Sequence, residues 1–211
     1  MKGQSRITLA IESAIAGGSI AILSDGDELA SWHGTSGAPR AEDLLVRIDE
    51  ILAANDISVG DLDLVAATAG PGSFTGVRIG LATALGLTCG LGISMASETA
   101  LKAMAFSRPE LTDVTAVVPC GRNAVCLQRF HRKNGELLES AEPRNITETE
   151  LTGLPAAHRE QTFLVHSSLS SQLASSPNVI DFGQNIASAL GRACQRMPLP
   201  HAKPLFISKA T

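Results

Sequence analysis

Residues 69–92 read AGPGSFTGVRIGLATALGLTCGLG, and this stretch decides the fold. It opens with a Gly-Pro-Gly turn at 70–72, and Ser73 then stands where a helix N-cap is expected. The apolar run that follows carries a single charge, Arg78, and another apolar run at 62–68 precedes the turn. The pattern therefore predicts a strand, a tight turn and a long helix.

The predicted helix contains two pairs of glycines, each pair spaced four residues apart, at 76, 80, 86 and 90. A glycine inside a helix costs about 1 kcal/mol relative to alanine, so four of them need a compensating reason. Either another backbone lies very close to the helix, or the turn brings main-chain N–H groups to a phosphate or nucleotide. The candidate phosphate contacts are Gly70, Gly72, Ser73, Thr75 and Arg78. Close packing is favoured, because the stretch matches neither a P-loop nor a dinucleotide-binding turn.

The composition is that of an ordinary globular protein with one or two small domains: 211 residues, 44% apolar and 18% charged, with a net charge of −4. The acidic balance and the 3% aromatic content argue against a general nucleic-acid binder. Four scattered cysteines and a polar start predict reduced thiols in a cytoplasmic protein. No membrane span is predicted, since the weakly charged run at 79–97 fits a buried helix and strand.

The predicted elements fall into two similar halves. The first half has predicted strands at 7–12, 19–23, 28–33, 62–68 and 93–96. Its predicted helices lie at 41–55, 73–91 and 98–106. A polar break at 107–113 predicts an N-terminal lobe of residues 1–106 and a smaller, more divergent C-terminal lobe of residues 107–211. The strand pattern then starts again, which indicates duplication of one β-rich unit. Those of the second half are strands at 114–119, 124–131 and 137–140, a short helix at 147–152, a strand at 163–166, a helix at 185–197 and an extended segment at 204–208.

No catalytic group and no metal site are predicted. The five histidines form no His-x-x-x-His pair. Ser73 and Thr75 have no histidine or acid placed beside them by a motif, and N-capping accounts for Ser73. Glu12, at the end of the first strand, has two interpretations: a carboxylate near a metal-bound phosphate, as in a working actin-like ATPase, or a solvated or capping carboxylate, which is favoured. Arg78 has two open interpretations, a pair within the chain or a pair with a phosphate or a carboxylate across an interface.

Small and leucine residues on two predicted helices form a candidate partner interface. They are Leu45, Ile48 and Leu52 on the first helix, and Gly76, Gly80, Leu81, Ala84 and Leu85 on the second. An exposed patch of this kind marks an interface, whereas the alternative is the core of the lobe. Substitution of Gly80 or Ala84 by arginine is expected to separate the two interpretations.

Five segments together resemble one protein family, TsaB (YeaZ-like). They are LAIES at 9–13, SIAI at 19–22, GPGSFTGVRIG at 70–80, SETAL at 97–101 and PLFIS at 204–208. The resemblance covers the first 105 residues well and the second half only by pattern. It implies an actin-like (ASKHA, ribonuclease H-like) two-lobed α/β fold.

The resemblance also implies a function and partners. TsaB proteins are non-catalytic partners of TsaD in bacterial synthesis of N6-threonylcarbamoyladenosine at position 37 of tRNAs that read ANN codons. The implied TsaD heterodimer uses the two helices at 41–55 and 73–91. TsaE and TsaC belong to the same pathway, tRNA is reached through the complex, and ATP is expected only within the TsaD/TsaE assembly. No cofactor of its own is expected.

The sequence departs from the family pattern in three places. The usual acidic position of the first strand is Glu12, one methylene longer, and a histidine common after the third strand is missing. The usual Asp-Ala-Arg-x-x-Glu of the second lobe is PCGRNA at 119–124, which keeps Arg122 and loses both carboxylates. Two other functions remain open: an independent glycoprotease-like peptidase or small phosphotransferase, and a homodimeric scaffold unconnected with tRNA.

Overall fold

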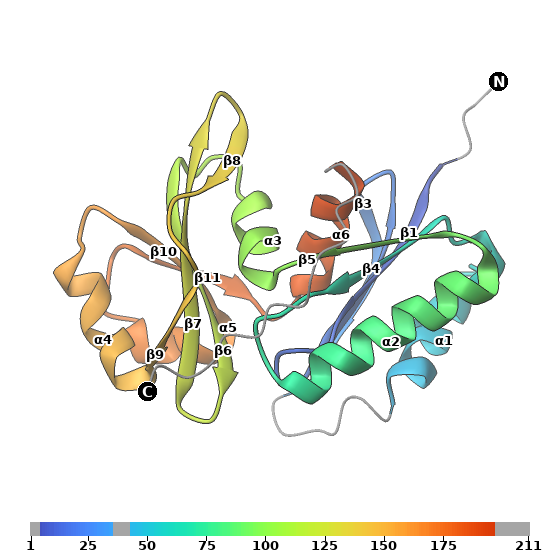
Figure 1. The fold of residues 1–211 in the computed structure, drawn as a ribbon, viewed down its shortest axis with the longest axis horizontal. Helices are drawn as coiled ribbons and strands as arrows, with labels where there is room; N and C mark the ends of the chain where they lie inside the picture. The colour runs from blue at the N-terminus through green and yellow to red at the C-terminus, as the bar shows by residue number, and fades with distance from the viewer. Residues whose placement is uncertain (1–4, 36–42, 197–211) are drawn as a thin grey trace.

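Two β-sheets stand side by side in the computed structural model, which describes residues 5–35 and 43–196 (Figure 1). The first sheet has five strands, in the order β3 (Asp27–His33), β2 (Ser19–Ser24), β1 (Ile7–Glu12), β4 (Leu64–Thr68) and β5 (Ser94–Glu98). The first three strands are antiparallel, as predicted, and β1, β4 and β5 are parallel to one another.

The second sheet repeats this arrangement. Its strands are β8 (Glu136–Glu139), β7 (Ala124–Lys133), β6 (Asp113–Gly121), β10 (Thr162–His166) and β11 (Val179–Gly183), with β9 (Arg144–Thr147) paired to β7. Strands β6, β7 and β8 are antiparallel in turn, and β6, β10 and β11 are parallel. Each strand of this path has its counterpart at the same place in the first sheet, so the predicted duplication of one unit accounts for the topology.

The central strands of the first sheet, β1, β2 and β4, are buried on both faces, whereas the edge strand β3 is mostly exposed. Helices α1 (Leu44–Ala53) and α2 (Phe74–Leu91) cover one face, where Leu9 and Ile11 of β1 join the same apolar cluster as Ile48. Helix α6 (Ile186–Arg196) covers the other face, where Ala10 of β1 packs in one cluster with Leu190. Alternate side chains of one strand thus serve two cores, which is why the strand is an uninterrupted apolar run.

The helix that ends each half packs at the junction of the halves. Helix α3 (Ala100–Phe106) places Leu101 and Met104 in the cluster of the second sheet, beside Phe130. Helix α6, from the end of the chain, lies against the first sheet, where Gly191 makes room for the side chain of Leu23. The strands therefore divide as the predicted lobes 1–106 and 107–211 do, whereas these two helices join both lobes. The boundary itself stays a prediction.

The remaining face of the second sheet is covered by α4 (Glu148–Ala157) and α5 (Ser167–Ser170), with short 3-10 turns at Ser171–Leu173 and, in the first lobe, Val59–Asp61. Leu127, Leu151 and Phe163 form the core of this layer. Helix α4 begins with a capping box, in which Thr147 and Glu150 satisfy each other's main-chain N–H groups. This box fixes the start of the helix where the sequence predicted it.

Three described elements were not predicted. Strand β9 and helix α5 are short and mostly polar, and the short edge strand β11 shows no alternation of buried and exposed residues, so none of them carries an apolar periodicity. Helix α4 also extends past the predicted end at 152 and includes Pro155. The predicted extended segment at 204–208 lies outside the described residues.

Candidate functional site

A cavity of about 360 Å³ lies between the two sheets, where the turns of two equivalent hairpins face each other. The turn between β1 and β2 contributes residues 13–16, and the end of β6 contributes Pro119 and Gly121. The start of α2 closes the third side with Ser73, Thr75 and Gly76. The first turn of the predicted helix therefore borders this cavity, whereas Gly70, Pro71 and Gly72 are not part of its lining.

The turn after β1 is fastened to the start of α2. The Ser13 hydroxyl donates to the Gly76 carbonyl oxygen at 2.8 Å, and the Ser73 N–H donates to the Ala14 carbonyl oxygen at 2.7 Å. A Cβ on Gly72 would collide with the Ala14 carbonyl, and one on Gly76 with the Ser13 carbonyl. These two glycines therefore permit close packing within the fold, which is the favoured interpretation of the sequence.

Glu12 organises the same turn and does not line the cavity. Its carboxylate is 2% exposed and accepts the N–H groups of Ala14 at 2.6 Å and Ile15 at 2.8 Å. Burial raises the pKa of Glu12 to about 7, and the two main-chain hydrogen bonds oppose that rise. Of the two sequence interpretations, the capping carboxylate is the one observed.

The five candidate phosphate contacts separate in space. Ser73 and Thr75 line the cavity, and the Ser73 hydroxyl also caps α2 by accepting the Gly76 N–H at 3.3 Å. Gly70 lies in the turn, where its carbonyl accepts the Ala100 N–H at 2.8 Å, and Gly72 lies against Ala14. Arg78 is outside the cavity lining, with its guanidinium 3.6 Å from the centroid of the Phe74 ring. The described residues of the cavity wall thus offer hydroxyl groups but neither a carboxylate for a metal nor a cation for a phosphate.

A metal centre finds no support in residues 5–35 and 43–196, which hold no cluster of three histidine, cysteine or carboxylate side chains. A Ser–His contact does occur, between Ser168 and His166 Nδ1 at 2.8 Å. His166 is 3% exposed and caps the four-residue helix α5. It does not line the cavity between the two sheets, nor either of the two further cavities of this structure that are described in later paragraphs. Burial lowers its pKa. This contact is explained by capping, and no sequence motif predicts it.

The predicted partner interface is divided by burial. Ile48, Leu52 and Ala84 are at most 4% exposed and belong to the core between α1, α2 and the first sheet. Gly76 and Gly80 are also buried, because they face Ser13. Placing these five residues on an exposed patch was wrong, since the apolar stripe of each helix faces its own sheet. Leu45 and Leu85 are 60% and 55% exposed, and Leu81 is half-buried.

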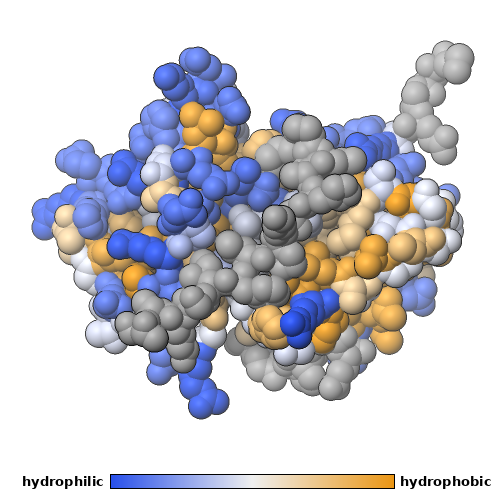
Figure 2. Space-filling view, in the orientation of Figure 1, coloured by the Kyte–Doolittle hydropathy of each residue, from blue (hydrophilic) through white to orange (hydrophobic). Residues whose placement is uncertain are grey.

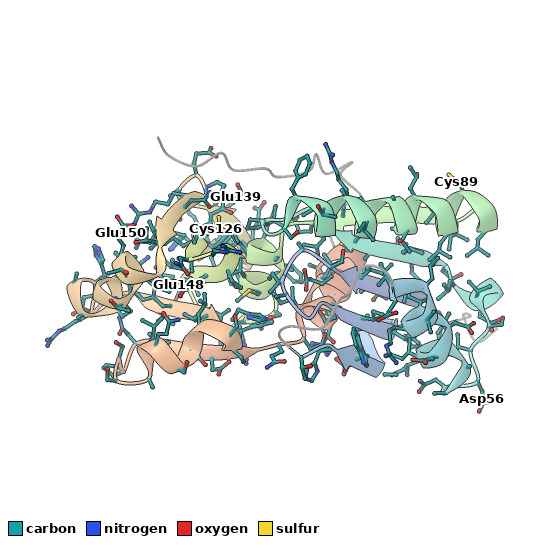
Figure 3. The ribbon with its side chains drawn as sticks, turned by 90° about the horizontal axis from the view of Figure 1, so that it is seen from below. Asp56, Cys89, Cys126, Glu139, Glu148 and Glu150 are labelled. Carbon is teal, nitrogen blue, oxygen red and sulfur yellow. The ribbon has the colours of Figure 1, made fainter. Side chains whose placement is uncertain are left out.

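The outward side of α2 is unusually apolar for a surface. Phe74 and Leu85 are about half exposed, and nothing lies within 4 Å of a Cβ placed on Gly86 or Gly90. Figure 3 shows Cys89 on the side of α2 that points away from the sheet. In Figure 2 apolar residues gather over this helix. The helix is long and apolar enough to cross a membrane by those two criteria alone, and only 28% of it is buried inside the chain.

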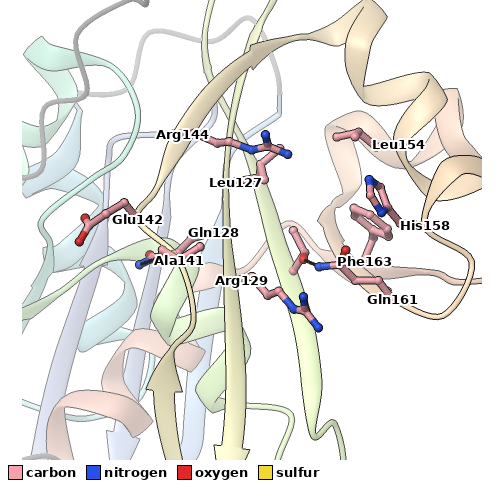
Figure 4. A pocket seen from close by; sticks show the side chains of 11 residues that line it. Leu127, Gln128, Arg129, Ala141, Glu142, Arg144, Leu154, His158, Gln161 and Phe163 are labelled. Atoms are coloured by element: carbon pink, nitrogen blue, oxygen red, sulfur yellow. Dashed lines mark hydrogen bonds between the residues drawn. The ribbon is translucent and has the colours of Figure 1, made fainter.

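A further cavity of about 290 Å³ lies in the second lobe, between β7, β9 and the end of α4 (Figure 4). Its floor is apolar, with Leu127 and Phe163, and its rim carries Arg129, Arg144 and His158. Arg129 already pairs with Asp113 at 3.4 Å, and the lining also includes the carboxylate of Glu142, so the cavity carries little unbalanced positive charge. No residue of this rim was singled out by the sequence.

Comparison with known proteins relates the chain to tRNA-modification proteins. The family model described as "TsaD: tRNA N6-adenosine threonylcarbamoyltransferase" matches residues 39–193. The "tRNA threonylcarbamoyladenosine biosynthesis protein TsaB" of Haemophilus influenzae is 32% identical over 62% of this chain and 56% of its own length. The Escherichia coli protein of the same name is 28% identical over 68% of this chain and 63% of its own. The matches thus span less than two thirds of these relatives.

Solved structures identify the fold. A Pseudomonas aeruginosa protein described as similar to peptidase YEAZ has a TM-score of 0.72 at 19% identity, over 96% of this chain and 100% of its own. Component A of the (R)-2-hydroxyglutaryl-CoA dehydratase of Acidaminococcus fermentans has a TM-score of 0.54 at 11% identity, over 90% of this chain and 98% of its own. The fold is the actin-like, two-lobed α/β fold, as predicted. With the family model matching most of its length and its relatives named TsaB, the chain belongs to the threonylcarbamoyltransferase family and, within it, to the TsaB (YeaZ-like) proteins.

Proposed function

We propose that this protein is a cytoplasmic, non-catalytic subunit of the complex that makes N6-threonylcarbamoyladenosine at position 37 of tRNAs reading ANN codons. In this role it binds a TsaD-type transferase and supports its activity, while TsaE joins the same assembly. Contact with tRNA is made through the complex. Any ATP is bound within the TsaD/TsaE assembly, and this chain contributes no cofactor.

The observation that carries the proposal is the outward side of α2. Leu85 stands 55% exposed beside Gly86, where a partner backbone meets no Cβ and has open space to approach. Exposed apolar side chains of a helix gain stability when a second helix covers them, and small residues let the two backbones come close. Leu45 on α1 is a further exposed leucine, at 60% exposure.

The cleft supports a non-catalytic role. The cleft is the cavity of about 360 Å³ between the two sheets. Its described lining contains hydroxyl groups from Ser13, Ser73 and Thr75 but no carboxylate, lysine, arginine or histidine. Hydrolysis of ATP or of a peptide requires a metal, a positioned base or an activated nucleophile. Within the described part of the chain, none of these borders the cleft.

Association with TsaD of the same organism tests the proposal directly. Size-exclusion chromatography with light scattering is expected to show a one-to-one complex. Leu85→Arg and Gly86→Arg should abolish the complex and leave the circular dichroism spectrum unchanged. Leu138→Arg, at a 40% exposed leucine on β8, is the matched control and should bind TsaD normally.

Three outcomes would overturn the proposal. The first is a stable homodimer that does not exchange for TsaD, which would favour the homodimeric scaffold. The second is binding of TsaD by the Leu85→Arg variant as tightly as by the unchanged chain. The third is hydrolysis of ATP or of a peptide by the purified protein alone at ordinary enzymatic rates.

A further inference from the structure

A polar cavity of about 270 Å³ lies beside α6 and shares no residue with the cleft. Its walls come from both lobes, since Glu28 belongs to β3, Phe182 to β11, and Arg108 follows α3. Ser188 and Arg192 contribute from α6, one helical turn apart. The cavity therefore sits where the first sheet, the last helix and the second sheet meet.

Several donors around this cavity have no acceptor at normal hydrogen-bond distance among the residues that the structure describes. Arg192 donates through Nε to the Gly26 carbonyl at 3.2 Å, which holds the side chain and leaves its terminal nitrogens unused. Asn185 accepts the Ser188 N–H through Oδ1 at 3.3 Å, which leaves its amide nitrogen unused. The Ser188 hydroxyl, on a residue 5% exposed, makes no hydrogen bond of normal length to any described residue. Its contact with the Glu28 carboxylate is strong enough to lower the pKa of Glu28 but is longer than a normal hydrogen bond, so the hydroxyl can donate at a better distance to a bound group.

Two guanidinium groups give the cavity its charge. Arg108 is held over the Phe182 ring, 5.8 Å from the ring centroid, and Arg192 stands on the facing helix. Glu28 is the single carboxylate of the lining, and the Ser31 hydroxyl donates to it at 2.7 Å. Burial acts to raise the pKa of Glu28, but the hydroxyls of Ser188 and Ser31 and the charge of Arg192 lower it overall. The wall thus carries two positive charges and one negative charge.

We propose that this cavity binds a small organic acid whose carboxylate or phosphate group is held by Arg108 and Arg192. A hydroxyl or ammonium group of the same ligand donates to Glu28, and the Ser188 hydroxyl donates to the acid. A guanidinium fork can donate two parallel hydrogen bonds to a carboxylate or to a phosphate group, whereas a lysine ammonium acts as a point charge. The volume lies at the lower end of small-molecule pockets, about 300 Å³, and so suits a metabolite rather than a dinucleotide.

Isothermal titration calorimetry on the full chain, with saturation-transfer NMR, tests the proposal. The probes are inorganic phosphate, malate, serine and phosphoserine. At least one acid that also carries a hydroxyl or ammonium group should bind saturably, with Kd of about 1 mM or tighter. Arg192→Gln and Arg108→Gln should weaken that binding at least about tenfold. Arg159→Gln, at an exposed arginine outside this cavity, is the matched control and should change nothing.

Two more variants keep the test decisive if Arg192→Gln disturbs folding. Ser188→Ala changes one buried atom and should weaken binding several-fold. Glu28→Gln should weaken the hydroxy and amino acids while leaving inorganic phosphate unchanged or tighter, because a repulsive charge is removed. The proposal is overturned if no probe saturates, which would leave water as the occupant, or if folded Ser188→Ala and Arg108→Gln variants bind as the control does.

Discussion

The hydroxyl of Ser13 donates a hydrogen bond to the main-chain carbonyl oxygen of Gly76 across 2.8 Å. The contact joins the turn after β1 to the first turn of α2, and a Cβ on Gly76 would occupy the place of the Ser13 carbonyl oxygen. Gly86, ten residues later on the same helix, faces open space. Two glycines that look alike in the sequence thus have different reasons to be glycine.

Alanine substitution at these two positions should give opposite results. Gly76→Ala must push apart two main-chain segments, so the free energy of unfolding should fall by about 2 kcal/mol or more. Gly86→Ala meets no atom and gains helix propensity, so the free energy of unfolding should rise by about 0.5–1 kcal/mol. Urea denaturation of both variants measures the pair, and equal effects of the same sign would contradict the packing assigned to Gly76.

The sequence could predict the role of α2 only in part. Residue spacing showed that the glycines share helix faces, but not which face meets the turn at Ser13 and which meets solvent. The same limit applies to Ile48 and Leu52, because an apolar stripe looks alike whether its own sheet or a partner covers it. Strand β11 was missed because, as an edge strand with exposed Ile180 and Asp181, it shows no alternation. The antiparallel start of the second lobe could be predicted, because its opening strands repeat the pattern of those in the first lobe.

Glu12 should make stability depend on pH with an unusual sign. Its pKa is raised to about 7 in the folded protein from the ordinary value of 4.5, so the folded state keeps a proton that the unfolded state releases between these values. The free energy of unfolding should therefore decrease as pH rises through this range, by about 3 kcal/mol from this group. The stabilising contribution is complete below pH 4.5 and is lost above about pH 7.

Glu12→Gln supplies the reference for this measurement, because glutamine keeps an oxygen acceptor for the Ala14 and Ile15 N–H groups and does not ionise. The unfolding free energy of the unchanged chain minus that of the variant should fall steadily as pH rises from 4.5 to 7. A difference that grows with pH would mean that the two main-chain hydrogen bonds stabilise the anion more than burial destabilises it.

Helix α1 carries one apolar residue in the core, Ile48, and another on the surface, Leu45. Ile48 is 3% exposed, so Ile48→Ala should lower the free energy of unfolding by about 3 kcal/mol through the cavity that it leaves. Leu45 is 60% exposed, so Leu45→Ala should change stability by less than about 0.5 kcal/mol. If Leu45→Ala nevertheless weakens association with TsaD, the surface assigned to the partner includes α1. Denaturation and the chromatography described above measure the two properties separately.

Lys102 should contribute to stability by linking the two lobes. Its ammonium lies 3.3 Å from Glu98 of the first sheet and 3.4 Å from Glu139 of the second. Burial lowers its pKa, but the two carboxylates outweigh burial and raise it overall. Glu98 is 7% exposed, so Lys102→Met would leave its carboxylate buried without the Lys102 ammonium beside it and should lower the free energy of unfolding by about 2 kcal/mol.

Glu139→Gln should lower the free energy of unfolding by less than about 1 kcal/mol, since the Glu139 side chain is 52% exposed and solvent screens its charge. Lys133→Met, at an exposed lysine on β7, controls for the loss of a positive charge and should have almost no effect on the urea midpoint. If Lys102→Met behaves as Lys133→Met does, the ion pair does not hold the lobes together, and the packing of α3 against α6 must account for their attachment.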